Sequence, residues 1–176
     1  MKLQADAKMN FGRDLVFETY RDRLPELCPY LPDIKAITVQ ERSDEGSTTK
    51  ILNLWEASTE IPKVAEKIIK PEMLAWLDHA TWDADARTVD WRIETKMFTE
   101  NVKCWGKNTV REDGDGCIFE IRGELEVSLK GIPGVPRFLA GKVAPHVEKF
   151  VVQLMTPNLL AVANGVERYL ADQADK

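Results

Sequence analysis

The pattern that decides the fold lies in TVDWRIETKMF, residues 88–98. Charged residues separate the apolar ones along this stretch, and the same alternation runs through CIFEIRGELEVSL, residues 117–129. Side chains of a β-strand project alternately to the two faces of a sheet, so a period of two predicts a strand with one buried face. In the first stretch this face would carry Val89, Trp91, Ile93, Thr95 and Met97. The sequence therefore predicts a sheet with one apolar face and one solvated face.

Other segments around these two also have the composition of strands. Polar turns of four or five residues separate several of them, and turns this short can join only antiparallel neighbours. The additional strands are expected at residues 2–11, 33–42, 49–57, 74–82 and 102–110, and the turns at 44–48, 83–87, 98–101 and 112–116. The sequence therefore predicts an antiparallel sheet of about six or seven strands.

Two short helices are expected after the first strand. Leu15, Val16 and Tyr20 have spacings compatible with one helix face, and Pro25 ends this stretch. Residues 27–31 would form a second short turn, and residues 62–70 a short helix or an irregular arm.

The period changes after GIPGVP, residues 131–136. Apolar residues then recur at intervals of three and four from 143 to 170, which predicts a long amphipathic helix. Pro145 would lie in its first turn, and Pro157 would kink or split it. The apolar face of the sheet needs a cover, and this helix is the only long one available. We therefore expect a single α+β domain over residues 1–176.

The composition of the chain argues against a nucleic-acid partner and against a membrane-spanning protein. The chain has 24 basic residues (Lys and Arg) and 29 acidic ones, a net charge of −5 with no basic block, so no nucleic-acid partner is expected. No apolar run reaches the ~20 residues that span a bilayer, which argues against an integral membrane protein. Three cysteines without CxxC spacing, together with an N-terminus unlike a signal peptide, favour a cytoplasmic location. Transient membrane contact through Lys142 and Lys149 stays open, as does the choice between monomer and homodimer.

The order of elements resembles the helix-grip fold of the START/Bet v 1-like (SRPBCC) superfamily, and is similar in style to its uncharacterised bacterial branches. The resemblance covers nearly the whole chain as element order and apolar pattern, without a signature motif. It is carried by ETYRDRLPELCPYLPDIKAITVQER (18–42), MLAWLDHATWD (73–83), VDWRIET (89–95) and the helix after GIPGVP. It implies a cavity between the curved sheet and the C-terminal helix. Members of the superfamily hold or transfer lipids, sterols, polyketides or hormones, and some cyclise or dehydrate polyketides.

Candidate ligand-binding residues are those expected on the inward faces. Trp76 and Trp91 would either line the cavity or pack as core residues against the terminal helix. The polar Asp78, Thr95 and Asn108 would either orient a ligand or make internal hydrogen bonds. Burial of Asp78 would raise its pKa, which makes it the best candidate for a general acid or base. The full predicted set is Trp76, Asp78, Trp91, Ile93, Thr95, Asn108, Phe119, Ile121, Phe150 and Leu154.

Other reactive side chains have simpler interpretations. Cys104 and Cys117 fall on inward faces as small core residues, and Trp105 is expected to point outward. His79 and His146 are far apart in the chain and are expected at the surface. Residues 113–116, DGDG, lack the remaining ligands of a calcium loop and predict a hairpin turn. No serine has a hydrolase motif, and no metal or cofactor is expected.

Three functions remain open. The first is a binding or transport module for a small hydrophobic molecule, lipid-like or polyketide-like. The second is an enzyme of the polyketide cyclase/dehydratase type that uses Asp78, Thr95 and Asn108. The third is an interaction domain with no small ligand. The sequence favours the binding module because it shows no catalytic constellation.

Overall fold

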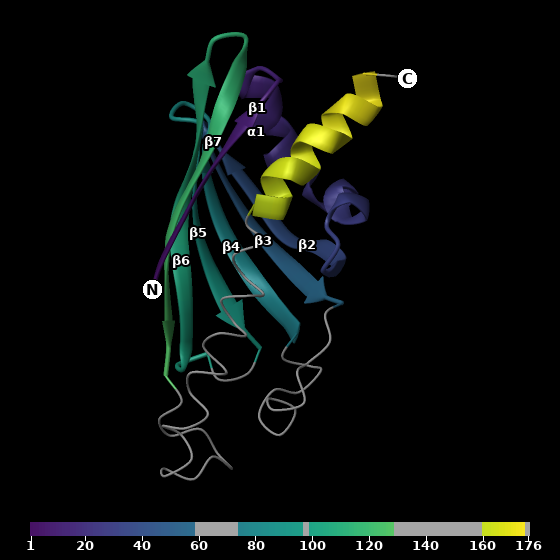
Figure 1. Cartoon of the computed structure of the whole chain (residues 1–176). Helices are drawn as coiled ribbons and strands as arrows, with labels where there is room; N and C mark the ends of the chain where they lie inside the picture. Colours follow the sequence, from purple (N-terminus) through teal and green to yellow (C-terminus); the bar gives the residue numbers. More distant parts are fainter. Residues whose placement is uncertain (59–73, 97–98, 129–159, 175–176) are drawn as a thin grey trace.

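The computed structural model describes residues 1–58, 74–96, 99–128 and 160–174. Two helices follow the first strand, and six strands follow the helices (Figure 1). The predicted arm at 62–70 lies outside the described residues. The elements are β1 (Lys2–Met9), α1 (Arg13–Asp22), the 3-10 helix η1 (Leu24–Tyr30), β2 (Ile34–Glu45), β3 (Thr48–Ala57), β4 (Ala75–Asp83), β5 (Thr88–Thr95), β6 (Val102–Asp113) and β7 (Gly116–Val127).

The strands form one curved antiparallel sheet of seven strands, in the order β1-β7-β6-β5-β4-β3-β2. The expected antiparallel meander is confirmed. Strand β1 forms one edge of the sheet by pairing with β7, so that Ala5 lies opposite Ile121. Two of the turns are tighter than predicted, because β2, β3, β6 and β7 extend further toward them. Each has two residues and starts with a glycine at positive φ, Gly46 at 61° and Gly114 at 62°. The DGDG stretch is thus a hairpin turn, as predicted.

Helix α1 packs on the concave side of the sheet against β6 and β7. The Tyr20 ring lies 4.7 Å from Trp82 and 5.2 Å from Phe119, and Phe17 lies 5.4 Å from Trp82. This aromatic cluster fills the end of the concave surface nearest the β6–β7 hairpin. Leu15 is 49% exposed, so it does not share a buried face with Val16. The helix instead turns its Val16–Phe17 side inward, because the bulkier Phe17 reaches Trp82.

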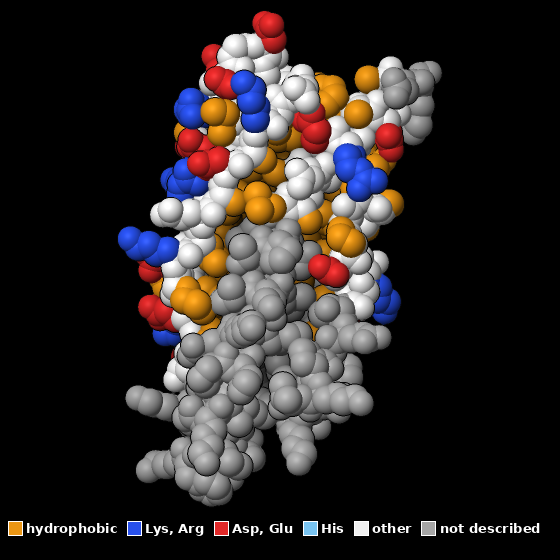
Figure 2. All heavy atoms as spheres, viewed as in Figure 1, with side chains coloured by type: hydrophobic (Ala, Val, Ile, Leu, Met, Phe, Trp, Pro, Cys, Tyr) orange, Lys and Arg blue, Asp and Glu red, His pale blue; other side chains and the backbone are white. Residues whose placement is uncertain are grey.

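The predicted C-terminal helix is described over residues 160–174, and it runs beyond residue 170. Its buried side chains, Val162, Ala163, Val166 and Leu170, recur at the spacing of one helix face. Figure 2 shows hydrophobic side chains gathered between this segment and the charged rim of the sheet. Residues 143–159, which include Pro145 and Pro157, lie outside the described residues.

Polar contacts tie this helical segment to the N-terminal part of the chain. Tyr169 donates a hydrogen bond to Glu26 of η1 (2.6 Å), and Asn10, next to the end of β1, donates one to Glu167 (2.7 Å). The rings of Tyr30 and Tyr169 meet edge to face at 6.2 Å. Within the described part of the chain, no helix is both long and apolar enough to cross a bilayer.

Candidate functional site

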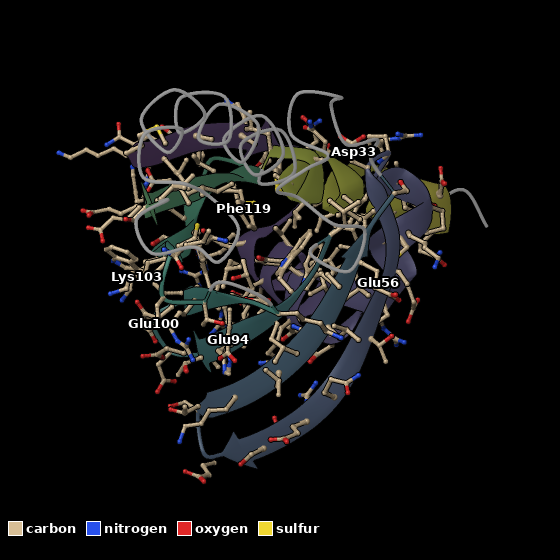
Figure 3. The ribbon with its side chains drawn as sticks, turned by 90° about the horizontal axis from the view of Figure 1, so that it is seen from below. Asp33, Glu56, Glu94, Glu100, Lys103 and Phe119 are labelled. Atoms are coloured by element: carbon tan, nitrogen blue, oxygen red, sulfur yellow. The ribbon has the colours of Figure 1, made fainter. Side chains whose placement is uncertain are left out.

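The register of the sheet places one mixed row of side chains across the concave face. Asn53 of β3 lies opposite Asp78 of β4, and Asp78 lies opposite Ile93 of β5. The row continues to Cys104 of β6 and Leu125 of β7. Figure 3 looks into the curve from below: Phe119 lies inside it, whereas Glu100 and Lys103 lie outside. The row therefore crosses a surface that is mostly apolar.

Asp78 is the ionisable member of this row. Asp78 is buried, with only 9% of its surface exposed. Burial raises the pKa of its carboxyl group from 3.8 to about 6. Asn53 Nδ2 donates a 3.3 Å hydrogen bond to Asp78 Oδ2, which lowers the pKa in part. The carboxyl group can therefore gain or lose its proton close to neutral pH.

Two buried polar atoms near this carboxyl group have no hydrogen-bond partner among the described residues. Asn53 is 1% exposed, and its Oδ1 atom accepts no hydrogen bond from the described residues. The Trp55 indole N–H lies close enough to Asp78 to lower its pKa, yet its geometry falls short of a hydrogen bond. A buried polar group without a partner costs about 1–3 kcal/mol. The region around Asp78 is therefore unsatisfied by the described part of the chain.

Two tryptophans lie beside Asn53 and Asp78. Trp55 and Trp76 face each other across β3 and β4, two residues along the strands from Asn53 and Asp78 and on the same face. Their rings stack with centroids 5.9 Å apart and planes 14° from parallel. Both residues are buried. The carboxyl group thus adjoins an aromatic wall.

Trp91 occupies a different position, flat against two glycines. Cβ atoms on Gly106 and Gly123 would lie 2.5 Å and 2.9 Å from its ring carbons. Its Nε1 donates to Asn108 Oδ1 (2.8 Å), and Asn108 Nδ2 donates to the hydroxyl of Tyr20 (3.3 Å). Asn108 therefore makes the internal hydrogen bonds that were the alternative to ligand orientation.

The structure places most of the predicted site residues on this concave face. Ile93 and Thr95 are only half-buried. Phe150 and Leu154 lie outside the described residues. The buried ones are Trp76, Asp78, Trp91, Asn108, Phe119 and Ile121.

Sequence reasoning missed Asn53 and Trp55. Both lie on β3, whose inward face also carries Thr49 and Ile51. The signal was present, because the period of two continues through TTKILNLWEA (48–57). Alternation alone does not show that Asn53 meets Asp78, since that pairing depends on the register.

The cysteines behave as core residues. Cys104 and Cys117 are buried, as predicted. Burial raises the pKa of Cys104 to about 12 and that of Cys117 to about 11, so both stay protonated thiols at neutral pH. Neither has the thiolate character that a nucleophile needs.

His79 lies on the outer face, where its Nε2 is 2.9 Å from Glu94 Oε2. This agrees with the predicted surface position, while His146 lies outside the described residues. The described segments contain no cluster of three or more His, Cys, Asp or Glu side chains that could hold a metal ion.

The outer face also carries an open hollow of about 430 Å³. Trp105 stands at its edge, 37% exposed and pointing outward as predicted. The lining mixes cations such as Lys107 with anions such as Asp90, which form a surface ion pair of 3.1 Å. Charges of both signs at an open surface define no particular ligand.

Comparison with known proteins shows the family and the fold. The model of a family described as "Protein of unknown function (DUF2505)" matches residues 19–156. No curated protein matches the chain.

Several solved structures are similar over nearly the whole chain. A Thermus thermophilus protein, TTHA0849, is 19% identical, with a TM-score of 0.68 over 98% of this chain and 99% of that one. The Zhui aromatase/cyclase of a Streptomyces species is 15% identical, with a TM-score of 0.68 over 99% of this chain and 95% of that one. Norcoclaurine synthase of Thalictrum flavum is 16% identical, with a TM-score of 0.62 over 98% of this chain and 87% of that one. These likenesses confirm the helix-grip, Bet v 1-like fold predicted from the order of elements.

Proposed function

We propose that this chain, which belongs to the DUF2505 family through a model that covers residues 19–156, binds a small, largely apolar molecule between the concave face of its sheet and its C-terminal helix. The ligand would be lipid-like or polyketide-like. Trp55, Trp76 and Ile93 would contact its apolar body, and Asn53 and Asp78 would contact a polar group.

The observation that carries this proposal is the unsatisfied polarity at Asn53 and Asp78. A core filled only by protein normally pairs its buried polar atoms, because each unpaired atom costs about 1–3 kcal/mol. Here Asn53 Oδ1 has no partner among the described residues, and the carboxyl of Asp78 is buried beside it. Ligand sites combine mostly apolar walls with a few such polar atoms. This combination favours a binding site over an ordinary core.

The structural neighbours support the same proposal by analogy. The Thalictrum norcoclaurine synthase was solved in complex with dopamine and hydroxybenzaldehyde, and the Streptomyces neighbour is an aromatase/cyclase. One fold hosts many functions, so these names support a small-molecule site without choosing the molecule.

Gentle isolation of the protein from its source, followed by native mass spectrometry, tests the proposal. We expect an added mass that disappears on solvent extraction, because an apolar ligand partitions into the organic phase. Extraction of an equally treated, unrelated protein is the control for adventitious lipid. A protein that carries no added mass and binds no apolar aromatic probe would contradict the proposal.

A second candidate function is acid–base catalysis on an enolising substrate of the polyketide type. The specific observation in its favour is the pKa of Asp78, which burial raises to about 6, since proton transfer is most efficient when the pKa is near the working pH. Thr95 lies nearby on β5 and would help to position the substrate.

Exchange of the α-protons of a β-diketone, followed by NMR in D₂O, tests this second function. We expect the protein to accelerate exchange and Asp78→Asn to abolish the acceleration, because an amide cannot take up the proton. Asp115→Asn, in the exposed β6–β7 turn, is the matched control. Equal exchange with the wild type and Asp78→Asn would remove Asp78 from this role.

A further inference from the structure

We propose that the ligand carries a protonated amine on its apolar body, and that the ammonium group lies between the carboxylate of Asp78 and Oδ1 of Asn53, beside the stacked rings of Trp55 and Trp76. This inference rests on the proposed function and adds the chemistry of the polar group.

The hydrogen-bonding capacity left over at the site includes a buried acceptor beside the carboxylate of Asp78. Asn53 uses its amide N–H to donate to Asp78 Oδ2, which leaves its Oδ1 as a buried acceptor. The Trp55 N–H is close to the same carboxylate and acts to lower its pKa. The Trp55 N–H makes no hydrogen bond to the described residues either, and Asn53 Oδ1 would be met by a donor from the ligand. An ammonium group has three N–H donors and no acceptor.

The charge of Asp78 has no counterpart among the described inward-facing residues of the sheet. The described inward-facing residues of β3–β7 include no lysine, arginine or histidine. Burial and the charge of Asp78 raise the pKa values of Tyr20 of α1 and Cys104 of β6, so neither supplies a cation. The charge of His79 is the last of the influences that lower the pKa of Asp78. His79, its neighbour in the chain, lies on the outer face paired with Glu94. A buried carboxylate is costly unless a cation pairs with it.

The stacked rings of Trp55 and Trp76 also favour a positively charged group on the ligand. Trp55 and Trp76 are stacked and buried two residues along the strands from Asn53 and Asp78. Tryptophan faces attract cations through the negative electrostatic potential above the ring. A hydroxyl group would satisfy Asn53 Oδ1, but it would leave the carboxylate charge uncompensated.

Three matched probes test the inference by calorimetry at about pH 8, where Asp78 is ionised. They are naphthylethylamine, naphthylethanol and ethylnaphthalene, which share the apolar body and differ in the polar group. We expect the amine to bind about tenfold tighter than the alcohol, which corresponds to 1.4 kcal/mol. The preference should vanish in Asp78→Asn and persist in Asp115→Asn. Asn53→Ala, which removes the other acceptor, should reduce it as well.

The pH profile adds a readout that a loss of packing would not produce. Affinity for the amine should fall as the pH drops through about 6, because protonation of Asp78 removes the charge that pairs with the ammonium. Affinity for the alcohol should change little over the same range.

The outcomes separate this inference from the proposed function. Equal affinity for all three probes would overturn the amine and leave the apolar site standing. Tighter binding of the alcohol than of the amine would assign a hydroxyl group instead. If none of the probes binds, the inference fails and the proposed function loses its support as well.

Discussion

Gly106→Ala should lower the free energy of unfolding by about 3 kcal/mol, the upper part of the usual range for overpacked substitutions. A Cβ atom at this position would lie 2.5 Å from a ring carbon of Trp91 and 2.7 Å from Cα of Gly123. It would come still closer to the carbonyl oxygen of Arg122. Two of these three atoms belong to the backbone of β7, which cannot withdraw without breaking its pairing with β6. Urea unfolding, followed by tryptophan fluorescence, measures the loss.

Gly12→Ala is the matched control. No atom lies within 4 Å of the Cβ position at Gly12, and its φ of −61° suits any residue. Its stability should therefore stay within about 0.5 kcal/mol of the wild type, as for most surface substitutions. If Gly106→Ala were equally harmless, Trp91 would not lie against β6 and β7 as the structure shows.

Asp78→Asn should have the opposite effect and stabilise the protein at about pH 8, by up to about 3 kcal/mol. The folded protein raises the pKa of Asp78 from 3.8 to about 6, mainly through burial. Between these two values the folded state binds more protons than the unfolded state, so stability falls as the pH rises through this window. Above about pH 6 the full cost of the buried charge is present, and an uncharged amide avoids it.

Unfolding at several pH values tests the sign of this prediction. The gain from Asp78→Asn should be largest above about pH 7 and should disappear below about pH 4, where the carboxyl is protonated in both states. Asp115→Asn, in an exposed turn, should show no such dependence. A variant less stable than the wild type at about pH 8 would mean that the charge of Asp78 serves the fold.

Together with the amine preference, this prediction describes a residue that trades stability for binding. The same substitution should strengthen the fold and weaken recognition of a cationic ligand. Such opposition is typical of functional sites, which keep groups that the fold alone would discard.

The sequence predicted the sheet well because its signals are local. Alternation along β5 and β7 identified the inward faces of Trp91 and Phe119, and short turns identified the antiparallel order. Asp78 was found because it interrupts an apolar face. These features depend only on neighbours in the chain.

The site itself depends on register, which is not local. Asn53 meets Asp78, and Gly106 meets Gly123, only because each hairpin pairs with one particular offset. A slip of one residue would turn either pair to opposite faces. The spacing of Leu15, Val16 and Tyr20 likewise does not reveal that Leu15 is exposed while Phe17 reaches the ring of Trp82.

The pairing of β1 with β7 also sets an order of events on the ribosome. Strands β2 to β6 can pair one hairpin at a time as they emerge from the ribosome. Strand β1 (Lys2–Met9) can pair only after β7 (Gly116–Val127) has been synthesised. Contacts between such distant segments are slow to form, and the waiting strand stays exposed in the meantime. The nascent chain therefore carries an unpaired, half-apolar segment through most of its translation, and this segment is where a chaperone would be expected to hold it.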